Sequence, residues 1–115
     1  DGLDEITITG RTKICEGKEG KVKCYHVEPR DFDLPTARLK DIIGGTPEQN
    51  ARILLEILSG QKGPRRDTVL LNASPALVAA GKASTLQEGV KLAAESIDRG
   101  AAMEKLERLR AVTNQ

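Results

Sequence analysis

The sequence predicts an α+β protein in which a small antiparallel sheet is followed by packed helices. Two observations support this: strand-like alternation is confined to residues 1–30, and apolar residues recur with helical spacing through residues 46–113. A length of 115 residues is typical of one domain with a single core. We therefore expect a β meander over 1–30 and a helical layer over 46–113 within one structural unit.

The composition argues against several functional classes. With 18 Lys and Arg against 17 Asp and Glu, the net charge of +1 does not suggest a partner that is a nucleic acid or a membrane surface. No stretch approaches the roughly 18 apolar residues that span a bilayer, and the first residues lack the features of a signal peptide. Two cysteines are too few for a disulfide scaffold, so we expect a reduced, cytoplasmic setting.

Three segments are predicted to be strands of the meander. Residues Glu5–Thr9 alternate and are rich in β-branched side chains, and residues 12–16 and 22–27 have similar strand character. A polar turn with glycine at both ends, residues 17–20, joins the last two strands. Pro29 is expected to end the last strand.

The two cysteines are expected to face each other across this hairpin. If Glu19 and Gly20 form a two-residue turn, then Cys15 lies opposite Cys24. A cross-strand disulfide is then conceivable, but ordinary reduced cysteines are the expected state. His26 is the only histidine, which leaves a zinc site or a catalytic triad without support, and we expect it on the surface at a strand end.

The first long helix has a clear start signal. Residues 31–38 are expected to form a loop and residues 39–43 a short helical turn. Thr46, Pro47 and Gln49 then match a capping box with proline at the first helical position. The apolar residues that follow with helical spacing are Ala51, Leu54, Leu55 and Leu58.

Three further helices are predicted after this one. The apolar run 69–81 indicates a buried helix, in which Pro75 should cause a kink or remove one backbone hydrogen bond. Ser84 or Thr85 caps the next helix, whose apolar stripe comprises Leu86, Val90, Ala93, Ala94 and Ile97. After Gly100 the last helix has the apolar residues Ala102, Met103, Leu106 and Leu109 and a predicted ion pair between Glu104 and Arg108.

Asp4 and Glu5 are the first candidates for a functional site. Mg²⁺ accepts one or two carboxylates, keeps water molecules and takes other ligands from substrate phosphates. Neighbouring residues of a strand point to opposite faces, so the pair can share a cation only if the chain curls before Ile6. Without such a curl the pair is a solvated surface feature, and the residues alone leave both interpretations open.

Two other segments have features of phosphate sites but also simpler explanations. The glycine pair before Thr46-Pro47 precedes a helix N-terminus, yet it matches neither the Walker pattern nor GxGxxG and is explained as a loop and cap. Arg65 and Arg66 could hold a phosphate, whereas Asp67 at a helix start simply complements the helix dipole.

The order of the motifs provides a further argument. They are DGLDEI at 1–6, DFDLP at 31–35, GGTPEQNA at 44–51, GPRRDTVLLNA at 63–73 and AGKA at 80–83, followed by the helix at 86–94. In this order they resemble the C-terminal part of the anthranilate phosphoribosyltransferase family over essentially the whole chain. The resemblance implies an α/β fold, namely the C-terminal part of the large α/β domain of a nucleoside-phosphorylase-like phosphoribosyltransferase.

The resemblance also implies a reaction and a metal site. Members of the family transfer phosphoribose from phosphoribosyl diphosphate to the amine of anthranilate, in tryptophan biosynthesis. Asp4 and Glu5 match the two acidic residues that serve Mg²⁺ in the family, while no catalytic or substrate-binding residue is implied within this chain. Asn72 lies in a family motif, where we expect it to serve helix packing, and Pro75 replaces the small residue expected there.

The family's other functional motifs lie upstream of this chain. They include the glycine-rich phosphoribosyl-diphosphate loop, the Lys-His-Gly-Asn segment, the arginine that meets anthranilate and most of the helical domain that forms the homodimer. We therefore expect a piece of the enzyme that is inactive by itself and whose partner is the remaining N-terminal part. The alternatives are a related nucleoside-phosphorylase-type transferase with another acceptor and a non-catalytic interaction module. A piece of an enzyme should expose apolar surface, whereas a module should be a stable monomer.

Overall fold

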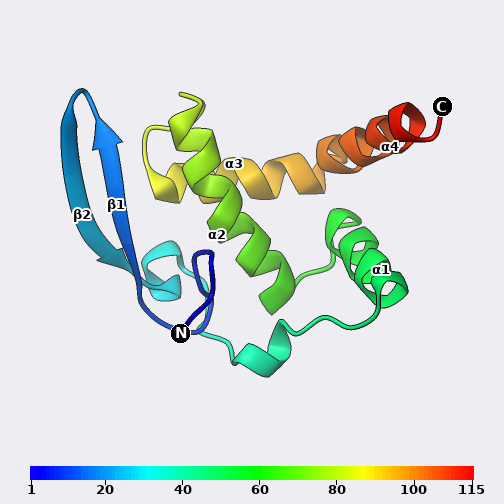
Figure 1. Ribbon diagram of the computed structural model, residues 1–115, viewed down its shortest axis with the longest axis horizontal. Coiled ribbons are helices and arrows are strands. Elements are labelled where there is room, and N and C mark those ends of the chain that lie inside the picture. The colour runs from blue at the N-terminus through cyan, green and yellow to red at the C-terminus, as the bar shows by residue number, and fades with distance from the viewer.

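The computed structural model describes residues 1–115 and has two strands followed by four α-helices (Figure 1). The elements are β1 (Thr12–Lys18), β2 (Lys21–Val27), the 3₁₀ turns η1 (Pro29–Phe32) and η2 (Leu39–Asp41), and the helices α1 (Pro47–Leu58), α2 (Pro64–Ala79), α3 (Leu86–Asp98) and α4 (Ala101–Thr113). Antiparallel strands followed by packed helices are confirmed. The predicted meander of three strands is instead a hairpin of two.

The hairpin has the register that its turn predicts. Glu19 and Gly20 both have positive φ angles, 53° and 76°, as a tight two-residue turn of this hand requires. Cys15 is therefore directly opposite Cys24, and their Cα atoms are 4.1 Å apart. The two cysteines form a disulfide, so the expectation of reduced thiols is wrong for this structure. His26 is exposed near the end of β2, as expected.

Residues Glu5–Thr9, predicted to be the first strand of the meander, do not form a strand. Neither alternation nor strand pairing is present: Thr7 and Ile8 are consecutive, yet both are buried, at 4% and 0% exposure. Side chains take the backbone groups that a neighbouring strand would need. The Thr7 N–H donates to the Thr12 hydroxyl, and both backbone groups of Ile6 bond to a side chain of α2. Such local competition between side chains and a sheet ladder disfavours a strand.

The start of α1 matches its predicted capping box, but the helix faces inward with other residues. The Thr46 hydroxyl accepts the Gln49 N–H, and the Gln49 side chain accepts the Thr46 N–H. Ile57 is the buried residue of α1, whereas Leu54 and Leu55 remain 44% and 41% exposed. The apolar stripe predicted for the core is thus partly on the surface of this chain.

Helices α2 and α3 cross closely and carry most of the core. A Cβ atom on Gly89 would lie 2.9 Å from the Ser74 carbonyl oxygen, so only glycine allows this approach of the two backbones. Ser74 is 1% exposed, and its hydroxyl donates to the Leu86 carbonyl at 2.6 Å. α2 continues through Pro75. The core cluster comprises Ile8, Val27, Phe32, Ile57, Leu70, Leu71, Val90, Ala93 and Ile97.

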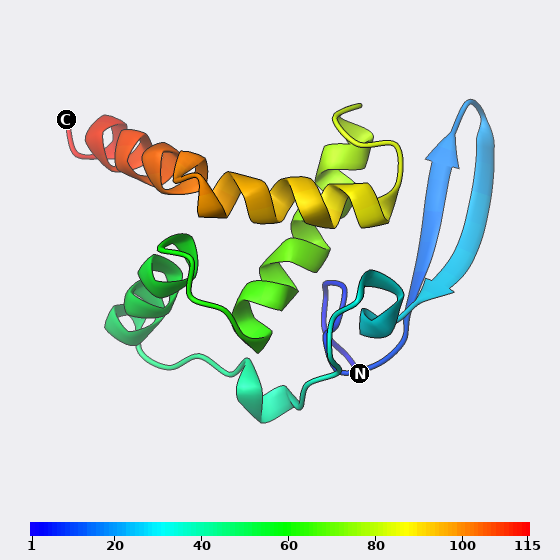
Figure 2. The same cartoon turned by 180° about the vertical axis from the view of Figure 1, so that it is seen from behind.

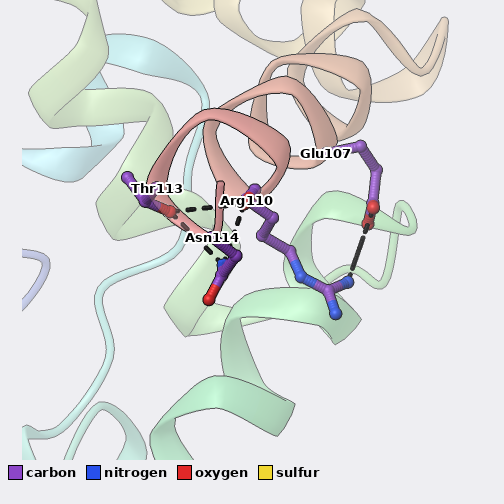
Figure 3. A network of polar contacts seen from close by, with 4 residues as sticks. All are labelled: Glu107, Arg110, Thr113 and Asn114. Atoms are coloured by element: carbon purple, nitrogen blue, oxygen red, sulfur yellow. Dashed lines mark hydrogen bonds and ion pairs between the residues drawn. The ribbon is translucent and has the colours of Figure 1, made fainter.

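The last helix ends in a local polar network (Figure 3). Arg110 forms an ion pair with Glu107 at 3.2 Å, and the Asn114 side chain donates to the Arg110 carbonyl at 2.8 Å. The same Arg110 carbonyl also accepts the backbone N–H of Asn114 at 3.1 Å, so the side-chain contacts add to the backbone bond at the end of the helix. The ion pair predicted between Glu104 and Arg108 does not form; the ion pair of this helix joins Arg110 to Glu107, three residues earlier.

The molecule is elongated, with extents of 43 × 32 × 22 Å. The hairpin projects at one end, the C-terminus of α4 lies at the other, and the N-terminal segment lies beside α2 (Figures 1 and 2). The helices pack mainly against one another, and most of β2 is exposed. None of the helices combines the length and apolar character that a membrane crossing requires.

Candidate functional site

Asp4 and Glu5 lie in a bend of the N-terminal segment, outside any strand. Both residues are exposed, and neither carboxylate takes part in an ion pair of the chain. The bend removes the alternation that would send neighbouring side chains to opposite faces. The condition set for a shared cation site, a chain that curls before Ile6, is therefore met.

The segment that carries the two carboxylates is attached to α2 by Asn72. The Ile6 N–H donates to Oδ1 of Asn72 at 2.8 Å, and Nδ2 of Asn72 donates to the Ile6 carbonyl at 2.9 Å. Sequence reasoning expected Asn72 to serve helix packing, but its amide instead bonds to a residue 66 positions away. The available signal was a polar side chain within the apolar run 69–73 of a helix.

A second set of contacts closes the segment on itself. The Asp1 carboxylate accepts hydrogen bonds from the hydroxyls of Thr7 and Thr9 and from the Leu3 N–H. Ile8, with no exposed surface, anchors the far end of the segment in the core. The Asp1 carboxylate is thus already hydrogen-bonded within the segment, whereas the carboxylates of Asp4 and Glu5 remain exposed to solvent.

The donor set in the bend fits Mg²⁺ that is shared with a substrate. Mg²⁺ takes oxygen ligands, is often bound through one or two carboxylates, and completes its shell with water and phosphate oxygens. Asp4 and Glu5 are two carboxylates that no cation of the protein neutralises. No cluster of three His, Cys, Asp or Glu side chains is present, so the chain has no closed cage for a metal.

The backbone N–H groups at the glycine pair before α1 are bonded to side chains from the first turn of that helix. The Gly45 N–H donates to Oδ1 of Asn50 at 2.8 Å, and a Cβ atom on Gly44 would meet the same side chain. The Thr46 N–H is likewise bonded to Gln49. The amide groups that would hold a phosphate already have partners, which supports the interpretation of a loop and cap.

The two arginines at the start of α2 also have structural roles. Arg66 is 5% exposed and forms two hydrogen bonds with the Asp98 carboxylate, at 2.8 and 3.1 Å. The hydrogen bonds from Arg66 hold the pKa of Asp98 below its ordinary value. Arg65 donates to the Ile43 carbonyl at 3.0 Å. Burial raises the pKa of Asp67 above its ordinary value, and the neighbouring Arg66 opposes this shift.

Comparison with known proteins identifies the class to which this fold and site belong. Residues 1–103 match the family described as "Glycosyl transferase family, a/b domain". The chain therefore belongs to this glycosyl transferase family.

Within the family, the similar proteins are anthranilate phosphoribosyltransferases. The chain is 52% identical to the enzyme of Symbiobacterium thermophilum, covering 100% of the chain and 34% of that protein. It is 47% identical to the enzyme of Methanobrevibacter smithii, covering 99% of the chain and 34% of that protein. The chain thus spans about a third of the length of the curated relatives it matches.

Solved structures agree with this grouping. The anthranilate phosphoribosyltransferase of Thermus thermophilus superposes with a TM-score of 0.89 at 37% identity, covering 100% of this chain and 34% of that one. The Saccharomyces cerevisiae enzyme in complex with PRPP and Mg superposes with a TM-score of 0.74 at 33% identity, covering 92% and 30%. The resemblance stated from the motifs is confirmed, and so is the fold class.

Proposed function

We propose that these 115 residues are the C-terminal third of an anthranilate phosphoribosyltransferase, within its large α/β domain. The intact protein transfers phosphoribose from phosphoribosyl diphosphate to the amine of anthranilate, and diphosphate leaves. The observation that carries this proposal is the agreement of sequence and fold with that enzyme over the whole chain. A related transferase with another acceptor is the alternative that an assay must distinguish.

Asp4 and Glu5 are the proposed Mg²⁺ ligands of this enzyme. Their exposed carboxylates lie in a bend with no competing cation, so they are available to a metal that also binds substrate phosphates. Bound Mg²⁺ would neutralise the negative charge that develops on the departing diphosphate. The yeast enzyme, whose structure was solved in complex with PRPP and Mg, supports a role for Mg²⁺ in the family.

The remaining part of the same enzyme is the proposed partner of this chain. Exposed apolar side chains support this, since Leu54 and Leu55 of α1 and Ile43 before it are 41–57% exposed. Exposed apolar groups of this size are expected where another part of a protein packs. The family resemblance further supports a homodimer of the intact enzyme, located in the cytoplasm.

The test is a turnover assay with anthranilate and phosphoribosyl diphosphate. The intact protein, with Mg²⁺, should consume anthranilate, which is measured by the loss of its fluorescence. The 115-residue chain alone should give no turnover, because the upstream substrate motifs of the family are missing. An intact protein that ignores anthranilate but accepts another base or amine would contradict the acceptor, and turnover by the chain alone would contradict its incompleteness.

A further inference from the structure

The Asn72 amide makes three hydrogen bonds that define its orientation. Nδ2 donates to the Thr68 carbonyl at 3.0 Å and to the Ile6 carbonyl at 2.9 Å, while Oδ1 accepts the Ile6 N–H at 2.8 Å. A carbonyl oxygen only accepts, so the Thr68 carbonyl requires the nitrogen on its side. The amide therefore presents a donor and an acceptor to the two backbone groups of a single residue.

This pairing controls the backbone next to Glu5. The Ile6 N–H belongs to the same planar peptide group as the Glu5 carbonyl. A hydrogen bond to that N–H fixes the plane that adjoins Glu5, and the bond to the Ile6 carbonyl fixes the following plane. Asn72 therefore holds the backbone that directly follows Glu5 in a defined orientation relative to α2.

Asn72 provides the hydrogen bonds that join the residue after the acidic pair to α2, and the Ile6 side chain also packs against the core. Asp4 and Glu5 are exposed and make no hydrogen bonds of their own. The Asp1 carboxylate bonds only within the N-terminal segment, and Ile8 is buried three residues beyond the pair. Asn72 is therefore the polar attachment nearest to the two carboxylates.

We propose that Asn72 is a positioning residue for the Mg²⁺ ligands Asp4 and Glu5. This proposal rests on the proposed function, since it assumes that these carboxylates hold the metal. Asn72 touches neither carboxylate and acts through the Ile6 backbone. Residues that hydrogen-bond directly to metal ligands change metal affinity by about 10–100-fold when they are removed, and we expect a comparable effect through the Ile6 backbone.

The test compares N72A with S74A in the intact protein. Both variants lose a side chain of α2 with hydrogen bonds to another segment, but Ser74 bonds to Leu86 at the α2–α3 crossing, away from the bend. For N72A we expect the Mg²⁺ concentration at half-maximal turnover to rise by about 10–100-fold, with activity partly recovered at saturating Mg²⁺. S74A should keep the wild-type Mg²⁺ dependence even if its melting temperature falls.

A second readout needs no metal and no activity. In the metal-free protein, hydrogen exchange of the Ile6 amide should be faster in N72A than in the wild type and unchanged in S74A. If N72A does not fold, N72Q keeps both polar groups but displaces them by one methylene, and it should raise the half-maximal Mg²⁺ concentration. A folded N72A or N72Q with wild-type Mg²⁺ dependence would overturn the proposal.

The carboxylate variants separate this proposal from the assignment on which it rests. If D4N and E5Q lose Mg²⁺-dependent turnover while N72A does not change the Mg²⁺ dependence, only the positioning role fails. If D4N and E5Q behave as the wild type, the metal assignment itself fails, and the positioning role fails with it.

Discussion

Arg66 is a buried cation whose carboxylate partner comes from another helix. Its guanidinium is 5% exposed and is held by both oxygens of Asp98, at the end of α3. The sequence indicated an arginine pair at the start of α2 but gave no sign of the partner 32 residues later. Such ion pairs depend on how the helices cross. The sequence can therefore show that a charged side chain is present, but not which residue pairs with it.

This ion pair makes the stability of the protein depend on pH in the acidic range. The pKa of Asp98 is lowered in the folded state, so its contribution is present above the unfolded pKa, about 4, and is lost as pH falls through the folded pKa. D98N should therefore lower the urea midpoint at pH 7, with a smaller difference from the wild type near pH 2. The exposed residue Asp33 provides the control D33N, which should not show this pattern.

Equal differences between D98N and the wild type at both pH values would contradict this explanation. The loss would then come from packing or helix-end effects rather than from the charge on the carboxylate.

The crossing of α2 and α3 is the element-scale contact that depends most on one small residue. A Cβ atom added at position 89 would press against the Ser74 backbone. G89A should therefore destabilise the protein by about 1–3 kcal/mol through overpacking. Helix propensity alone predicts the opposite sign, a gain of about 1 kcal/mol for glycine to alanine. Chemical denaturation should measure the loss, and K91A, at an exposed position of the same helix, is the control. A more stable G89A would contradict the close crossing.

Elements with local start signals were predicted well from the sequence. Thr46 with Gln49 begins α1, Thr85 caps α3, and the Glu19-Gly20 turn determines the hairpin register. The segment Glu5–Thr9 was predicted wrongly because its backbone partner, Asn72, lies far along the chain. Local sequence patterns describe propensity, and a long-range hydrogen bond overrode it here.

At the scale of the whole molecule, the burial of an apolar helix face depends on which other segments of the protein pack against it. Leu54 and Leu55 have the spacing of a core stripe, yet they are exposed in this chain, and Ile57 faces inward instead. Amphipathic spacing shows that a face is apolar but not which segment covers it. For the candidate site, the acidic pair and its metal were inferred from the family motif. The bend that makes the pair available and its attachment to α2 required the structure.

The proposal that Asp4 and Glu5 hold Mg²⁺ is tested most directly by a Mg²⁺ titration of turnover in the intact protein carrying D4N or E5Q. The matched controls are D33N and E104Q, which neutralise exposed carboxylates elsewhere in the chain. Loss of a group that stabilises transition-state charge typically costs on the order of 10²–10³-fold in rate. We expect D4N and E5Q to lose turnover on that scale at ordinary Mg²⁺ concentrations, with the controls unchanged. Wild-type Mg²⁺ dependence in both variants would show that Asp4 and Glu5 do not hold the metal.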